Sequence, residues 1–97
     1  MTLAQQKQKL LEYLKQDCDS YREEGIPKDV LPVICNAGCI IDLVSYDTLD
    51  EMVDKATCLR DLEQLCQKTL NFNWSVGFDE VCEYAGIDVG TYEFMGI

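Results

Sequence analysis

Six cysteines are the residues of this sequence best suited to metal chemistry, because thiolates bind zinc and iron–sulfur clusters. Cys35 and Cys39 are four residues apart, so on a helix both would point to one side, with Asp42 following on nearly the same side. The sequence has no Cys-x-x-Cys pair and no histidine, so four zinc ligands would have to come from scattered positions. We therefore expect no metal site, and reduced thiols acting as small core residues at Cys18, Cys35, Cys39, Cys58, Cys66 and Cys82.

Acid–base catalysis would depend on carboxylates, since the commonest general base, histidine, is missing. Two pairs, Asp50 with Asp54 and Asp79 with Glu83, have the four-residue spacing that places both side chains on one helix face. Pairs of this kind are typical of solvated helix surfaces. A reactive cysteine needs electropositive neighbours to form a thiolate, and this chain is acidic and has no glycine-rich phosphate loop. We predict that the protein is not an enzyme and binds no cofactor.

Three segments have the periodicity of helices. Residues 3–24 repeat apolar residues at three-, four- and seven-residue intervals, and a Gly-Ile-Pro sequence then ends the pattern. Residues 48–70 begin with a capping box, in which Thr48 would cap the helix and Glu51 would reach back, and continue with an apolar face. Residues 75–97 indicate two short helices, the first closed by a glycine.

Residues 28–46 fit two structures. As a helix, the segment would be apolar on most of its circumference and therefore central and buried. As a hairpin, residues 30–35 and 39–46 would be strands joined by a turn at Gly38, which the content of valine and isoleucine favours. An isolated hairpin is only marginally stable, so we predict the helix. The expected fold is one all-α domain over residues 1–97, a compact bundle of four to five helices, with an α+β fold containing a hairpin at 30–46 as the alternative.

Residues 78–92 resemble the helix–turn–helix of tetracycline-repressor-type proteins. Cys82 occupies the small position, Ala85-Gly86-Ile87 the turn and Asp88 the cap of the second helix. The resemblance implies a DNA-reading helix after the turn. The charge argues otherwise, because residues 69–97 contain five acidic residues and no lysine or arginine, whereas a recognition helix approaches phosphates. We expect no direct contact with nucleic acid.

The net charge of −10 on 97 residues indicates what kind of partner the protein has. The first 28 residues carry five acidic and five basic side chains, and the remainder carries thirteen acidic and three basic ones. An acidic surface excludes docking on anionic lipids and favours a basic protein. No apolar stretch has the length of an export signal or a bilayer span, so we expect a cytoplasmic protein.

These observations predict a small acidic protein-binding module, an inhibitor that occupies a basic, nucleic-acid-binding surface of a bacterial partner. In size and charge alone the chain is similar to phage-encoded anti-restriction and anti-CRISPR proteins, some of which imitate nucleic acid. Aromatic anchors inside an acidic rim would suit such a surface. The predicted partner-binding residues are Trp74, Asp79, Glu80, Glu83, Asp88, Tyr92, Asp50, Glu51 and Asp54.

The alternative is a regulatory or assembly module that keeps the helix–turn–helix shape and acts as a homodimer. Its first helix carries a stripe of Leu3, Leu10 and Leu14 that could pair with a second copy. The same stripe could instead pack inside the monomer.

Overall fold

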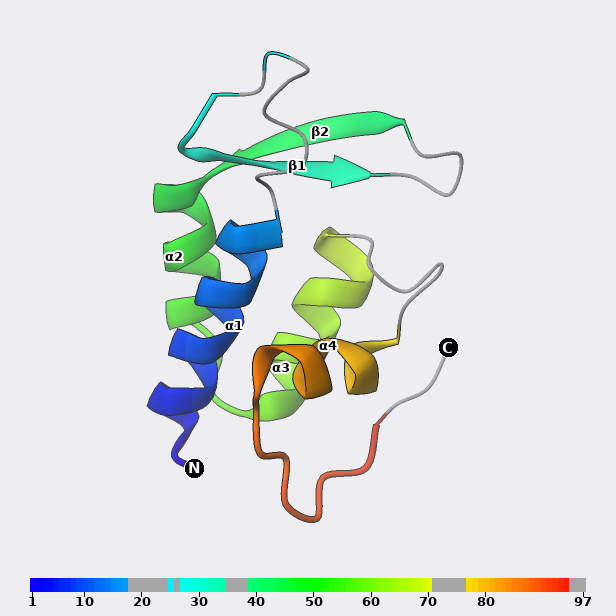
Figure 1. The fold of residues 1–97 in the computed structure, drawn as a ribbon. Helices are drawn as coiled ribbons and strands as arrows, with labels where there is room; N and C mark the ends of the chain where they lie inside the picture. Colours follow the sequence, from blue (N-terminus) through cyan, green and yellow to red (C-terminus); the bar gives the residue numbers. More distant parts are fainter. Residues whose placement is uncertain (18–24, 26, 35–38, 71–76, 95–97) are drawn as a thin grey trace.

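A β-hairpin lies across one end of a layer of helices (Figure 1). The computed structural model describes residues 1–17, 25, 27–34, 39–70 and 77–94. In chain order the elements are α1 (Leu3–Asp17), β1 (Val30–Ile34), β2 (Ile40–Ser45), α2 (Tyr46–Asp54), α3 (Leu59–Gln64), the π-helical turn η2 (Leu65–Thr69) and α4 (Phe78–Ala85).

The prediction of an all-α bundle is wrong, because residues 30–45 form two antiparallel strands rather than a central helix. Leu31 pairs with Val44, and both side chains are buried, as is Val33. The hairpin is therefore not isolated: its inner face packs on the helices and gains the burial that a two-stranded ribbon in water lacks. The β-branched residues then follow their ordinary preference for a half-buried sheet. The α+β alternative is the closer description.

The hairpin has features that limit pairing with further strands. Pro32, on β1, has no N–H to offer and stands opposite Leu43. The N–H of Leu43, on β2, donates to the Asp42 carboxylate at 2.8 Å. Ile41 is an extra residue between the pairs Val33–Asp42 and Ile34–Ile40, and such bulges also disturb an edge.

Residues 48–70 do not form the single helix expected from their periodicity. Ser45 caps α2, with its Oγ accepting a hydrogen bond from the N–H of Thr48 at 3.2 Å, so the predicted cap at Thr48 is wrong. The helix α2 ends at Asp54, and a second helix, α3, begins at Leu59. Thr57 donates from its backbone N–H and its hydroxyl to Asp61, at 2.8 and 2.9 Å, and these bonds lower the pKa of that carboxyl.

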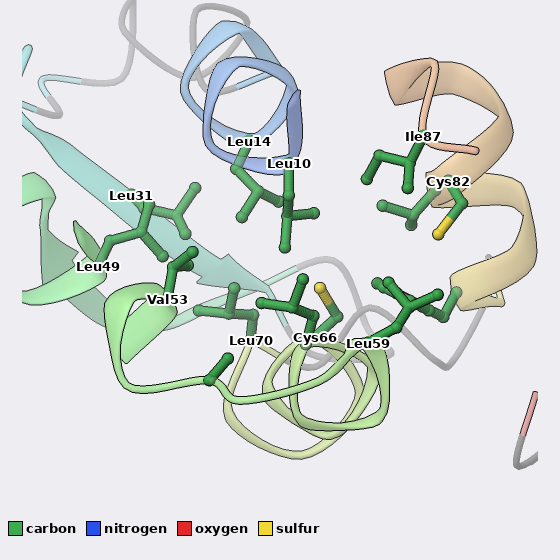
Figure 2. Close-up of a cluster of buried hydrophobic side chains, with 14 of the residues drawn as sticks. Leu10, Leu14, Leu31, Leu49, Val53, Leu59, Cys66, Leu70, Cys82 and Ile87 are labelled. Atoms are coloured by element: carbon green, nitrogen blue, oxygen red, sulfur yellow. The ribbon is translucent and has the colours of Figure 1, made fainter. Parts of the chain in front are cut away.

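The core lies between α1, the inner face of the hairpin, α3 and α4. Leu10 and Leu14 of α1 are fully buried and point among residues from the other elements, as Figure 2 shows. The buried apolar residues are Leu10, Leu14, Leu31, Val33, Val44, Leu49, Val53, Ala56, Leu59, Leu62, Cys66, Leu70, Phe78, Val81, Cys82 and Ile87. Leu10 and Leu14 of the predicted dimer stripe are thus buried within one chain, whereas Leu3 is half-buried.

The cysteines divide between core and surface. Cys66 and Cys82 are buried core residues, as expected, whereas Cys39 and Cys58 are exposed. Burial raises the pKa of Cys82 to about 12 and raises that of Cys66 as well, so both thiols stay protonated at neutral pH. Cys18 and Cys35 lie outside the described residues.

None of the helices in the described part of the chain has the length and apolar character needed to cross a membrane.

Candidate protein-binding surface

α4 presents one apolar face to the core and one acidic face to solvent. Phe78, Val81 and Cys82 are buried, in agreement with the helical pattern predicted for this segment. Asp79 and Glu80 lie in the first turn, where a negative charge interacts favourably with the helix dipole. The fold of α4 therefore leaves its carboxylates pointing away from the core.

The acidic face of α4 is not neutralised by the rest of the described structure. Asp79, Glu80 and Glu83 are exposed, and none of them forms an ion pair with any residue that the structure describes. Tyr84 lies beside them with 66% of its surface exposed. An exposed aromatic ring among free carboxylates has the composition of a binding hot spot for a basic surface.

Tyr84 is a candidate that the sequence interpretation missed, since the aromatic anchors that it predicted were Trp74 and Tyr92. A helical wheel could have found it. At about 100° per residue, Tyr84 lies roughly 40° from Glu80 and well outside the arc of the buried α4 residues. The position of Tyr84 in the helical repeat, rather than its residue type, therefore indicates that its side chain is exposed.

The turn after α4 starts like the predicted helix–turn–helix but does not continue into a second helix. Gly86 ends α4 in the left-handed conformation with φ 76°, and the N–H of Ile87 donates to the Cys82 carbonyl at 2.8 Å. Residues 86–94 then form turns and irregular chain. The structure therefore has no recognition helix at residues 88–94, and the resemblance to a helix–turn–helix extends over one helix and a turn only.

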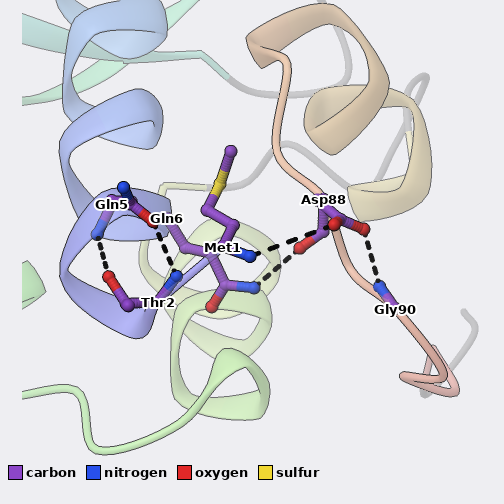
Figure 3. A network of polar contacts seen from close by, with 6 residues as sticks. All are labelled: Met1, Thr2, Gln5, Gln6, Asp88 and Gly90. Atoms are coloured by element: carbon purple, nitrogen blue, oxygen red, sulfur yellow. Dashed lines mark hydrogen bonds and ion pairs between the residues drawn. The ribbon is translucent and has the colours of Figure 1, made fainter.

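Asp88, predicted as the cap of that second helix, instead joins the tail to the start of α1 (Figure 3). Its Oδ1 accepts a hydrogen bond from the N–H of Gly90 at 3.1 Å, and its Oδ2 lies 4.0 Å from the amino group of Met1. Gln6 donates from its side chain to the Asp88 carbonyl at 2.8 Å. Asp88 is exposed, but its carboxylate already interacts with the amino group of Met1 and the N–H of Gly90.

Tyr92, predicted as an exposed anchor, is half-buried and makes internal contacts. Its hydroxyl donates to Oε1 of Glu63, a carboxylate that is completely buried. Burial and the nearby carboxylate raise the pKa of Tyr92, so the hydroxyl remains the donor. The ring packs edge-on against Phe94, with centroids 5.1 Å apart, and the Arg60 guanidinium lies 6.0 Å from the ring centre.

The acidic residues predicted on α2 form a separate group. Asp50 forms an ion pair with Lys15 of α1 at 2.8 Å, while Glu51 and Asp54 are exposed. α1 packs against both α2 and α4 and lies between them in Figure 1. The two groups of predicted acidic residues therefore belong to different parts of the surface. Trp74, the remaining predicted anchor, lies outside the described residues.

Metal coordination gains no support from the described residues, in which no three histidine, cysteine, aspartate or glutamate side chains gather at one point.

Comparison with protein-family models, with curated proteins and with solved structures finds no match to this chain.

Proposed function

We propose that this protein is a binding module that occupies a basic surface of a partner protein through the exposed face of α4. The observation that carries the proposal is a cluster of three exposed carboxylates, those of Asp79, Glu80 and Glu83, beside the exposed ring of Tyr84. None of the three forms an ion pair with a described residue. The carboxylates would attract and orient a basic partner over several ångströms, and the ring would supply buried area on contact.

The class of partner follows from the charge of the protein. A surface that binds nucleic acid carries lysine and arginine side chains placed to contact phosphates. Carboxylates spaced along a helix can contact the same side chains and block access of the nucleic acid. We therefore propose inhibition of a nucleic-acid-handling protein by steric block, with a bacterial complex as the target.

The test compares four baits in a nuclease-treated bacterial lysate at low and high salt, with bound proteins identified by mass spectrometry. The baits are the wild type, Tyr84→Ala, the α4 variant Asp79→Asn/Glu80→Gln/Glu83→Gln, and a control variant Asp29→Asn/Asp47→Asn/Glu93→Gln. The control also removes three negative charges, but from exposed positions outside α4. Circular dichroism establishes that each bait is folded.

We expect the wild type and the control to retain the same basic nucleic-acid-binding protein, which high salt releases. The α4 variant and Tyr84→Ala should each lose it, although Tyr84→Ala leaves the net charge unchanged. Equal losses with the α4 variant and the control would show that net charge alone drives capture and would contradict the proposed surface. Capture of a neutral or acidic protein by a salt-resistant contact would contradict the proposed partner class.

A further inference from the structure

A groove of about 890 Å³ runs between α1 and α2, away from α4. Its volume falls within the range of pockets that bind ligands in proteins. Leu3 and Leu11 of α1, both half-buried, and the exposed Ala4 supply apolar surface to it, and Val53 of α2 is buried at its base. The groove is therefore an apolar channel with a polar rim.

The groove has the length of a short helix. Its lining on α1 extends from Leu3 to Lys15, which at 1.5 Å per residue corresponds to roughly 18 Å, whereas its lining on α2 extends only from Asp50 to Asp54, roughly 6 Å. A helix laid along two packed helices places side chains at i, i+3, i+4 and i+7 into the channel. The hairpin offers a poorer alternative for an extended segment, because Pro32 and the Asp42–Leu43 hydrogen bond occupy its edges.

The charges on the rim of the groove indicate the sign of the charge that its occupant would carry. Of the two lysines of the rim, Lys15 forms an ion pair with Asp50 at 2.8 Å, and Lys7 donates to the Asp54 carbonyl at 2.9 Å and keeps its positive charge. Glu12, Glu51 and Asp54 form no ion pair with any described residue, although Glu12 accepts a hydrogen bond from the Gln8 side chain at 3.3 Å. With two lysines and four carboxylates, the lining residues carry a net charge of −2. An apolar channel with a net negative rim is complementary to a segment that is apolar on one side and basic at its margins.

We propose that this groove binds an amphipathic basic helix of a partner protein, with apolar anchors in the channel and lysine or arginine side chains on the acidic rim. The proposal does not depend on the α4 surface, because no α4 residue lines the groove.

The probe is a synthetic peptide of about fourteen leucine and lysine residues, ordered so that the leucines form one helical face. A second peptide has the same composition in an order without an apolar face. Binding of each to the full chain is measured by fluorescence anisotropy at about 0.15 M salt, where attraction between distant charges is screened.

Two substitutions on α1 provide the matched comparison. Ala4→Arg places a large cationic side chain in the groove, and Gln16→Arg adds the same charge at an exposed position that does not line it. Both positions are exposed on a helix in which arginine is well tolerated, so the fold is expected to survive both changes.

We expect the amphipathic peptide to bind the wild type at least about tenfold more tightly than the reordered peptide, a difference of about 1.4 kcal/mol. Ala4→Arg should weaken that binding about tenfold, whereas Gln16→Arg and the triple α4 variant should change it less than about threefold. Equal affinity for the two peptides, or equal effects of the two arginine substitutions, would overturn the proposal. Loss of binding in the α4 variant with Ala4→Arg unaffected would place the peptide on α4 and overturn it as well.

Discussion

The buried carboxylate of Glu63 shows how single contacts determine the course of the tail. Tyr92 donates its hydroxyl hydrogen to one carboxylate oxygen, and the Gln67 side chain lies 3.5 Å from the other. The Glu63 carboxylate is removed from water, so its hydrogen bonds within the protein replace those that it made to solvent. The Tyr92–Glu63 contact thereby ties residues 87–94 to α3.

Removing this hydroxyl provides a test of the contact. Tyr92→Phe should lower the free energy of unfolding by about 1–3 kcal/mol, because the buried carboxylate loses a hydrogen-bond donor. Urea unfolding followed by circular dichroism measures the difference. Tyr84→Phe is the control, and its exposed hydroxyl should change stability by less than about 0.5 kcal/mol. Equal effects of the two substitutions would show that the Glu63 contact contributes nothing to folding.

At the scale of elements, the sequence indicated α1 and α4 but also predicted a helix where β1 and β2 form and another after Gly86, where the structure has turns. α1 and α4 carry apolar residues at helical spacing and lie within the segments where the pattern predicts helices, and residues 18–24 of the predicted first helix lie outside the described residues. The start of α2 depends instead on which hydroxyl accepts a hydrogen bond from the backbone N–H groups of its first turn. Ser45 ends β2 and caps α2 at once, so the strand leads into the helix with no connecting loop.

The position of this cap can be tested with two alanine substitutions. Ser45→Ala should destabilise the protein by about 1 kcal/mol, because the N–H of Thr48 loses its acceptor. Thr48→Ala should cost less, since the Thr48 hydroxyl contacts only the Ser45 side chain at 2.8 Å and caps no backbone group. Thermal unfolding of both variants measures the order. A larger loss for Thr48→Ala would place the start of the helix at Leu49, as the sequence pattern alone predicts.

At the scale of the whole molecule, α1 organises the fold. It contacts α2, α3 and α4, and its fully buried leucines lie at the centre of the core in Figure 2. The stripe that could have formed a homodimer through Leu10 and Leu14 is therefore occupied within one chain. Leu3, the third residue of the predicted stripe, is half-buried, and the homodimer stays a prediction.

Truncation of a central leucine tests this assignment. Leu10→Ala should destabilise the folded chain by about 2–5 kcal/mol through lost burial and a residual cavity. If the leucine serves the monomer, the melting temperature of the wild type will not change over a hundredfold range of about 1–100 μM protein. A melting temperature that rises with concentration in the wild type, and no longer does so in Leu10→Ala, would restore the stripe as a dimer interface.

The sequence by itself determined the helical periodicity of α1 and α4, the excess of carboxylates and the acidic face of α4, because each depends on residue types at local spacing. It left residues 28–46 open, since a segment that is apolar on all sides satisfies either a buried helix or a strand. Only the tertiary structure decided for the hairpin, because the helices bury the inner face that an isolated hairpin would expose. The same packing turned Tyr92 inward to Glu63, left Tyr84 at the surface and formed the groove between α1 and α2. These outcomes depend on contacts between residues far apart in the chain, which local patterns do not contain.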